Sequence, residues 1–252
     1  MMTDSINLVM QSDDFGMCHA GNEGVVRAFR DGILTQASVM VPCPWFAEAV
    51  QLATEHAIPV GVHLTLTAEW DYLRWGPLTG GRSLVGSDGR FPKTIEAVRE
   101  NADQGEMLEE FLAQVELFKE HELEPGYFDC HMGVVTPEPY VEVCQRYGRP
   151  FDYPIGDVAV GFDSIHMLSG RPAEDKLPYL LDRISALEPG KHLVVSHCAV
   201  DSEELRSMTS DDASNVAWAN EYRVSDLAVL TSPEVRQVIE DRGVRLVSVA
   251  DL

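Results

Sequence analysis

The stretch INLVMQSDDFG, residues 6–16, begins as an apolar run and ends on two neighbouring aspartates and a glycine. Three later apolar runs also end on chemically active side chains: Val60–Leu66 carries His63, Tyr127–Phe128 precedes Asp129 and His131, and Leu193–Val195 precedes His197. In a barrel of alternating strands and helices, the carboxyl ends of the strands form one rim, where catalytic groups collect. The pattern therefore predicts that these aspartates and histidines meet at one end of the molecule.

Strand-like and helix-like segments alternate along the chain. We expect strands near residues 6–11, 36–41, 60–66, 127–130, 151–155, 192–196 and 244–249, and helices over 20–31, 44–56, 105–121, 137–147, 173–187 and 232–242. No GxGxxG pattern follows the first strand, which argues against a dinucleotide-binding sheet. We predict an α/β fold: an incomplete or distorted (β/α) barrel of about seven parallel strands with crossover helices, forming a single domain over residues 1–252.

Composition limits the partners. A formal net charge of -22 argues against nucleic acid or an anionic membrane as a partner, since both require basic patches. The five cysteines are scattered without a CxxC pair, which indicates reduced thiols. We find no signal-peptide pattern and no run long enough to span a membrane, so we expect a cytoplasmic protein. A homo-oligomer remains open.

Residue types at the strand ends suggest metal-assisted hydrolysis. One of Asp13 and Asp14 could bind a divalent metal while the other takes a proton from water; the alternative is a solvated turn. With strand periodicity, His63 shares a face with Gly61 and Thr65, as a ligand or as a hydrogen-bonded core histidine. Asp129 shares a face with His131, and either orients it or is itself a ligand. His197 suits a general acid or transition-state donor better than a ligand.

The long loop over residues 67–92 carries Trp70, Tyr72 and Trp75, which could stack on sugar faces or form a small apolar cluster beneath the loop. His166 lies in a second expected loop, 156–172, and could touch a substrate there. No serine or cysteine lies in a nucleophile-elbow pattern. A glycosidase acid pair stays open, but metal-assisted hydrolysis uses more of the strand-end residues.

Four motifs together are similar to those of a known family: SDDFG at 12–16, GVHLTL at 61–66, FDCH at 128–131 and SHCA at 196–199. With the tail from Leu227 onward, the chain resembles the YdjC-like carbohydrate deacetylases, which include chitooligosaccharide deacetylases. The resemblance implies a barrel-like fold, one divalent metal ion (magnesium or zinc), and removal of an N-acetyl group from an amino sugar as substrate. It further implies that the metal ligands are Asp14, His63 and His131, the general base Asp13, and the acid near the leaving amine His197.

The chain departs from the family pattern at three places. Met132 and Gly133 stand where members often have further histidines, Cys198 replaces a proline, and none of Phe151, Asp152 and Tyr153 is the arginine often expected near the fifth strand. We therefore predict a substrate other than a plain chitooligosaccharide. Two alternatives remain: a metal hydrolase of another amide or phosphoester bond, and a non-catalytic homologue that binds metal and sugar.

Overall fold

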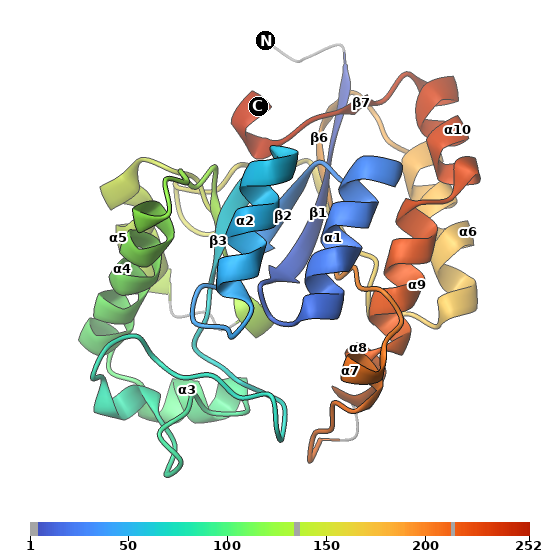
Figure 1. The fold of residues 1–252 in the computed structure, drawn as a ribbon. Coiled ribbons are helices and arrows are strands. Elements are labelled where there is room, and N and C mark those ends of the chain that lie inside the picture. Colours follow the sequence, from blue (N-terminus) through green and yellow to red (C-terminus); the bar gives the residue numbers. More distant parts are fainter. Residues whose placement is uncertain (1–4, 134–136, 213–214) are drawn as a thin grey trace.

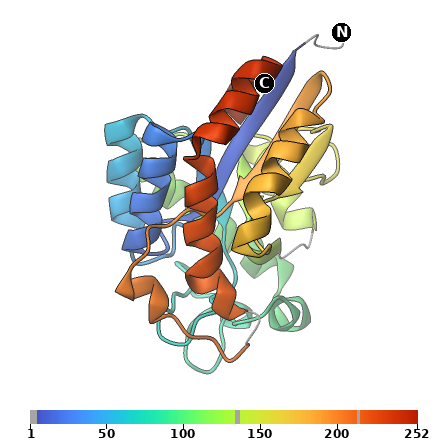
Figure 2. The same ribbon diagram turned by 90° about the vertical axis from the view of Figure 1, so that its right-hand side faces the viewer.

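The computed structural model describes residues 5–133, 137–212 and 215–252. Its strands form one parallel sheet with the order β4-β3-β2-β1-β6-β5, and β7 pairs with the first half of β1, before β2 joins its second half. The sheet curls into a half-barrel (Figures 1 and 2). The strands are β1 (Ile6–Phe15), β2 (Gln36–Val39), β3 (Val60–Leu64), β4 (Phe128–Cys130), β5 (Ser164–Met167), β6 (Gly190–Ser196) and β7 (Arg245–Leu246).

The helices cover the outer side of this curl. In Figure 1, α1 and α2 lie in front of the sheet, α4 and α5 to its left, and α6, α9 and α10 to its right. The carboxyl ends of the strands point down, towards the loops that carry α3, α7 and α8. The α-helices are α1 (His19–Asp31), α2 (Phe46–His56), α3 (Ile95–Asn101), α4 (Gln104–Glu120), α5 (Pro137–Tyr147), α6 (Ala173–Ser185), α7 (Glu203–Arg206), α8 (Val216–Ala219), α9 (Glu221–Leu230) and α10 (Pro233–Arg242), and the 3₁₀ turns are η1 (Arg82–Leu84), η2 (His131–Gly133) and η4 (Val249–Asp251).

Several helix boundaries follow from local chemistry. The Asp103 carboxylate accepts hydrogen bonds from the backbone N–H groups of Gly105 and Glu106, which begins α4. Ser232 caps α10, with Pro233 in its first turn, and Gly243 ends that helix at φ 62°, a conformation that glycine adopts without steric cost.

The alternation of side chains along β1 separates core from site. Leu8 and Met10 pack into the large apolar core between the sheet and the helices. Val9 faces the other way, into a smaller apolar cluster with Tyr127 and residues of β6 and the C-terminal segment. Period-2 alternation puts Gln11 and Asp13 on this same inner face, nearer the carboxyl end of the strand. The inner face is thus apolar at one end and polar at the other.

The predicted α/β fold, a distorted barrel of about seven parallel strands, is confirmed. The predicted fifth strand over 151–155 is wrong. Only Phe151 makes isolated bridges there, to Phe128 and Ala159, and β5 lies instead at 164–167, inside a stretch predicted to be loop. Pro154, which has no backbone N–H, weakens the 151–155 segment as a strand. The pairing of β5 with β6 involves a half-buried segment that lacks a strong apolar signal.

Candidate active site

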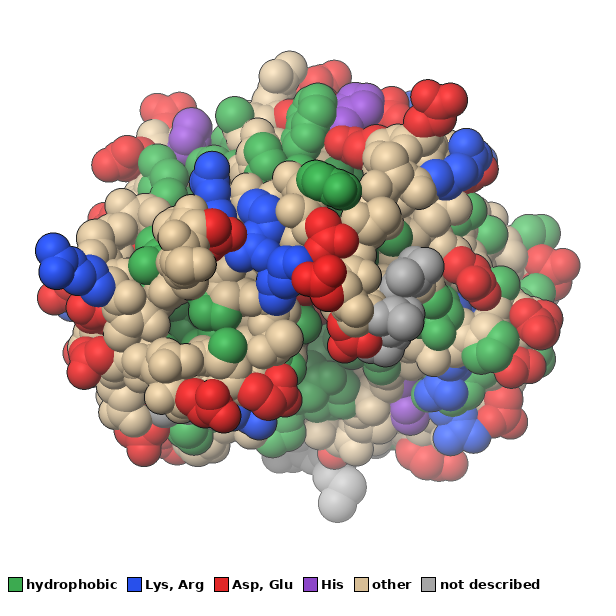
Figure 3. Space-filling model, turned by 90° about the horizontal axis from the view of Figure 1, so that it is seen from below, with side chains coloured by type: hydrophobic (Ala, Val, Ile, Leu, Met, Phe, Trp, Pro, Cys, Tyr) green, Lys and Arg blue, Asp and Glu red, His purple; other side chains and the backbone are tan. Residues whose placement is uncertain are grey.

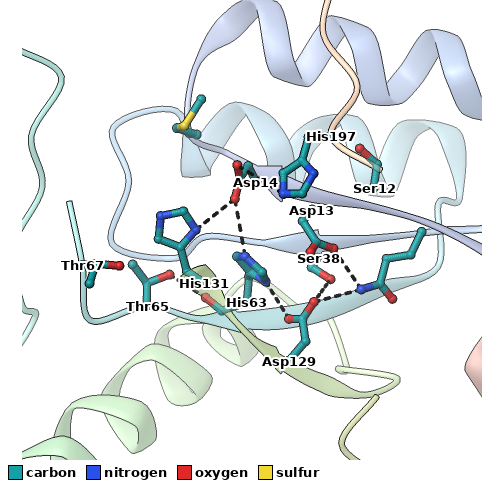
Figure 4. A network of polar contacts seen from close by, with 12 residues as sticks. Ser12, Asp13, Asp14, Ser38, His63, Thr65, Thr67, Asp129, His131 and His197 are labelled. Carbon is teal, nitrogen blue, oxygen red and sulfur yellow. Dashed lines mark hydrogen bonds and ion pairs between the residues drawn. The ribbon is translucent and has the colours of Figure 1, made fainter. Parts of the chain in front are cut away.

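Three side chains from separate strand ends converge at the lower end of the half-barrel (Figure 4). Asp14 lies near the end of β1, His63 lies on β3, and His131 begins the turn after β4. Oδ1 of Asp14 lies 3.4 Å from Nε2 of His63 and 3.1 Å from Nδ1 of His131. All three residues are buried. The predicted meeting of these residues therefore occurs.

The backbone of β1 explains how both neighbouring aspartates face the same pocket. In a regular strand, adjacent side chains point to opposite faces. Here the pairing of β1 with β2 shifts register between Ser12 and Phe15, and Asp14 has φ 65°. A left-handed conformation at a residue other than glycine costs on the order of 1–3 kcal/mol and is concentrated at functional sites. The bulge re-aims the aspartates, and both line the pocket.

The outer nitrogen of each histidine lies within ion-pair distance of a carboxylate. Nδ1 of His63 lies 2.8 Å from Oδ1 of Asp129, its register partner on β4. Nε2 of His131 lies 3.0 Å from Oε2 of Glu69, in the loop after β3. Such partners fix the orientation of metal-ligating histidines. Asp129 therefore contacts His63, and the predicted orientation of His131 by Asp129 is wrong; Glu69, which the sequence reading missed, takes that place.

The donor set fits a divalent metal ion. Ligand atoms of Asp14, His63 and His131 all lie within 4.8 Å of one another. Oδ1 of Asp14 is buried and accepts no hydrogen bond of good geometry, so it is available as a ligand. One carboxylate and two imidazoles suit several divalent metals, zinc among them. The three residues could hold such an ion, and the donor types do not choose between magnesium and zinc.

Charges within this cluster shift its pKa values strongly. Burial alone would raise the pKa of Asp14, but Arg223 and His131 outweigh it and hold that pKa well below the usual range. Burial would likewise lower the pKa of His131, yet Glu69 and Asp14 raise it to about 9. The pKa of His63 is raised well above its usual value, because Asp129 and Asp13 outweigh burial. Without a metal ion, both imidazole rings are therefore protonated on both nitrogens and positively charged at neutral pH.

Arg223 of α9 is a further member of the site that the sequence reading missed. Its Nη2 donates to Oδ2 of Asp14 at 2.7 Å, and its Nε donates to the backbone oxygen of Trp218 at 2.8 Å. Arg223 is buried. No local signal could have found it, because 209 residues separate it from Asp14 and it lies on a helix rather than at a strand end.

Asp13 lies next to a group of carboxylates. Nε2 of Gln11 lies 2.9 Å from Oδ1 of Asp13, 3.0 Å from Oδ2 of Asp129 and 3.0 Å from Oδ2 of Asp152. Burial, followed by repulsion from Asp129, raises the pKa of Asp13 to about 7. A carboxylate with a pKa near neutrality can both take and release a proton at physiological pH.

His197, after β6, faces the same pocket. Its Nδ1 lies 2.8 Å from Oγ of Ser169, and its Nε2 lies 4.0 Å from Oδ2 of Asp14. The ring packs edge-on against Trp218, with centroids 5.2 Å apart. Burial lowers the pKa of His197 to about 3, with Arg223 adding to the effect against the attraction of Asp14. The unliganded ring is therefore neutral at pH 7.

A pocket of about 570 Å³ lies over these groups. Trp70 lines it and is buried, whereas Trp75 is buried beneath the loop, where its Nε1 donates to the backbone oxygen of Thr67. Viewed from below, the molecule carries acidic side chains around the edge of this face (Figure 3). The pocket is lined by Asp13, Asp14, His63, Glu69, Trp70, Asp129, Cys130, His131, Met132, Gly133, Phe151, Asp152, Tyr153, Pro154, Ile155, Met167, His197, Asn215, Trp218 and Arg223.

His166 is not in this pocket. It lies on β5, with Nδ1 3.3 Å from the hydroxyl of Tyr179 on α6, and it lines a separate pocket of about 350 Å³. The predicted contact with a substrate thus does not arise in the pocket that holds the converging aspartates and histidines. Side chains of β5 alternate, and the pocket is reached instead by its neighbour Met167.

Among residues 5–133, 137–212 and 215–252, no helix is both long and apolar enough to span a bilayer.

The fold and the site define an α/β half-barrel with a buried aspartate–histidine cluster at the carboxyl ends of its strands. The chain belongs to the YdjC-like protein family, whose model matches residues 7–241.

Relatives match along nearly the whole chain. Carbohydrate deacetylases of Thermus thermophilus and Geobacillus stearothermophilus are 30% and 31% identical to it, over 93% and 95% of this chain and 89% and 95% of their own. A chitooligosaccharide deacetylase of Yersinia enterocolitica is 26% identical over 97% of this chain and 98% of its own. The crystal structure of an Enterococcus faecalis protein, described as a suspected cellobiose-phosphate cleavage protein, matches with a TM-score of 0.83 and 24% identity over 98% of each chain, which shows a shared fold.

Proposed function

We propose that this protein is a metal-dependent carbohydrate deacetylase, which hydrolyses the N-acetyl group of an amino sugar to acetate and a free amine. The observation that carries the proposal is the convergence of Asp14, His63 and His131, with Asp13 beside them, in one pocket. The names of the full-length relatives support the same activity.

Asp14, His63 and His131 are the proposed holders of one divalent ion, magnesium or zinc. When bound, such an ion supplies positive charge that polarises the acetyl carbonyl and favours ionisation of water. Asp129 and Glu69 form ion-pair contacts with the outer nitrogens of the two histidines, which leaves the inner nitrogens directed at the site. Arg223 keeps Asp14 ionised and occupies its second oxygen.

Asp13 is the proposed general base. It lies next to Asp14 in the chain, and its Oδ1 accepts a hydrogen bond from Gln11, which leaves Oδ2 to take a proton from the attacking water. A pKa of about 7, raised chiefly by burial, suits this task, because efficiency is greatest when the pKa of the base is near the working pH.

His197 is the proposed acid for the departing amine. Hydrolysis removes one proton from water and delivers one to the amine nitrogen. Because the ring of His197 is neutral at pH 7, its Nε2 must first take up the proton that leaves the water and then pass that proton to the amine. Nε2 faces the pocket across Asp14 from the ligand histidines. Trp70, Tyr153 and Trp218 line the pocket and offer faces on which a sugar ring could stack. The proposed substrate is therefore an acetylated amino sugar or oligosaccharide.

The test is acetate release from a panel of N-acetylated mono- and oligosaccharides, with protein loaded separately with magnesium and with zinc. Asp13→Asn should lose at least about 100-fold in kcat while still binding metal, the range typical for loss of an acid–base group. His63→Ala should lose both metal and activity. His56→Ala, at the end of α2 remote from the pocket, is the matched control and should retain both.

If no acetate appears from any sugar while metal remains bound, the deacetylase proposal fails. Hydrolysis of another amide or of a phosphoester would then identify the alternative hydrolase, and sugar binding without turnover would identify a non-catalytic homologue.

A further inference from the structure

A buried ion pair lies directly behind His197. Nζ of Lys176, on α6, lies 2.5 Å from Oδ1 of Asp226, on α9, and neither side chain is exposed to solvent. Lysine is almost never fully buried without a partner, and removing two charges from water costs several kcal/mol per ion. The proposed hydrolysis does not involve this pair directly, so its burial beside the site requires an explanation.

Asp226 is connected to His197 by two routes. Its Oδ2 accepts the hydroxyl hydrogen of Ser169, and it also accepts the backbone N–H of His197 at 2.8 Å. Oγ of Ser169 lies 2.8 Å from Nδ1 of His197. Lys176 is itself fixed by a second bond, to the backbone oxygen of Tyr222 at 2.8 Å. A continuous chain of contacts thus runs from Lys176 through Asp226 and Ser169 to the imidazole ring.

The direction of each hydrogen bond follows from the chemistry of the groups. An ionised carboxylate only accepts, and a serine hydroxyl has a single hydrogen to donate. Since Ser169 donates that hydrogen to Asp226, its oxygen must accept from His197, and Nδ1 of His197 must carry a hydrogen. Nε2, facing the pocket, then carries no hydrogen in the neutral ring and is the ring nitrogen that can take up a proton and pass it on.

The charge on Asp226 is secured by its partner. Burial raises the pKa of Asp226 above its usual value, and Lys176 and the hydrogen bond from Ser169 offset only part of that rise. A proton on Asp226 would leave the buried ammonium group of Lys176 without a counter-charge. An unpaired charge in the protein interior is strongly destabilising. Lys176 therefore keeps Asp226 in the accepting form on which the direction of the chain depends.

We propose that Lys176, Asp226 and Ser169 are positioning residues that hold His197 in one tautomer, with Nδ1 protonated and Nε2 directed into the pocket. The kinetic consequence rests on the proposed function, in which His197 moves a proton at Nε2; the tautomer itself does not. Helix α9 joins this arrangement to the rest of the site, because Arg223, three residues before Asp226, binds Asp14 from the same helix.

Ser169→Ala is the decisive variant and Ser169→Thr its conservative rescue, since only threonine retains the hydroxyl. Long-range ¹H–¹⁵N correlation spectra of the histidine side chains report which ring nitrogen of His197 carries the hydrogen. We expect the Nδ1–H form in the parent and in Ser169→Thr, and a shift towards Nε2–H in Ser169→Ala. An Nε2–H signal in the parent, or the same tautomer in Ser169→Ala as in the parent, would overturn the proposal even if the protein deacetylates nothing.

Kinetics supply the second arm. Ser169→Ala should lower kcat about 10–100-fold, the usual effect of removing such an outer partner, with little change in KM, and Ser169→Thr should restore most of kcat. Ser164→Ala is the matched control, because Ser164 makes the same 2.8 Å contact with Nδ1 of His192 outside the pocket. That variant should leave kcat unchanged. Equal losses in the two alanine variants would contradict a specific role for Ser169.

Removing Asp226 alone would leave the buried charge of Lys176 unpaired and destabilise the fold. The two residues are therefore replaced together, as Lys176→Met/Asp226→Leu. If the three residues act through one another, Ser169→Ala should lower kcat less than about twofold further in this background, since the link is already broken. A full multiplicative loss would show that Ser169 acts independently and would overturn the proposed relay.

Discussion

Asp14 is the carboxylate that contacts all three cationic side chains of the site, His63, His131 and Arg223. One of its oxygens faces two histidines, and the other accepts from Arg223. Arg223 and His131 outweigh burial and hold the pKa of Asp14 well below its usual range, so this carboxylate is ionised at neutral pH. The effect on the histidines is the opposite. The carboxylates on both sides of His63 and His131 raise their pKa values, so the rings hold protons that a metal ion must displace.

Metal binding should therefore release protons and strengthen as pH rises. The pKa of His131 is raised to about 9 and that of His63 well above its usual value, mainly by carboxylates that outweigh burial. A raised pKa means that the metal-free histidine stays protonated through neutral pH, so the apparent metal affinity should rise up to about tenfold per pH unit for each proton displaced, until the pH passes the pKa. Titration of metal into weakly buffered protein with a pH indicator measures the release directly. An affinity that is flat between pH 6 and 8 would contradict these shifts.

Glu69 should tune metal affinity through His131. Glu69→Gln keeps the size of the side chain but removes the negative charge 3.0 Å from Nε2. We expect the metal dissociation constant to rise about 10–100-fold, as is usual when such a partner is lost. Competition against a chelator of known affinity measures the change. Glu23→Gln is the control, because Glu23 lies 3.6 Å from His19 at the surface; the same loss there would point to a general charge effect.

At the scale of elements, the site residues at the ends of strands could be predicted from the sequence, whereas the site residues on helices could not. Asp14, His63 and His131 follow apolar runs, and the parallel arrangement brings such ends together whatever the details of the turn. Arg223 and Asp226 lie on α9, and whether a helix face meets the site depends on how that helix packs, which no local pattern records. The same limit explains the misplaced fifth strand, since β5 is defined by its pairing with β6 and not by its own residues.

Helix α1 controls the segment that carries His197. A Cβ placed on Gly24 would come within 2.3 Å of Cα of Ala199, two residues after His197. Alanine favours a helix over glycine by about 1 kcal/mol, but this contact is with backbone and can be relieved only by moving the segment. We expect Gly24→Ala to lower both Tm and kcat. Thermal unfolding and the acetate assay measure this, with Gly80→Ala as the control because its Cβ would meet nothing within 4 Å. An unchanged or higher Tm in Gly24→Ala would show that α1 can shift freely.

At the scale of the whole molecule, the site is a concentration of buried charge inside a chain with a formal net charge of -22. Asp14, Asp129 and Glu69 are all buried within or beside one pocket. Asp152 is buried beside them, and burial and repulsion from Asp129 raise its pKa well above the usual value. His63 and His131, whose raised pKa values keep them protonated, and Arg223 offset part of this negative charge in the metal-free protein. A bound divalent ion would reduce the repulsion among these buried carboxylates. Metal binding should therefore raise the free energy of unfolding of the whole chain.

Metal should accordingly raise the melting temperature of the parent protein. A ligand present at 100 times its Kd stabilises the native state by about 2.7 kcal/mol, which corresponds to roughly 5–10 °C for a chain of this size. His63→Ala removes one proposed ligand and should show little of this rise at the same metal concentration. Scanning calorimetry of both proteins, with metal and with chelator, separates the two. If metal stabilised the variant and the parent equally, the stabilising ion would have to bind elsewhere, because the ring nitrogen lost in the variant could not be among its ligands.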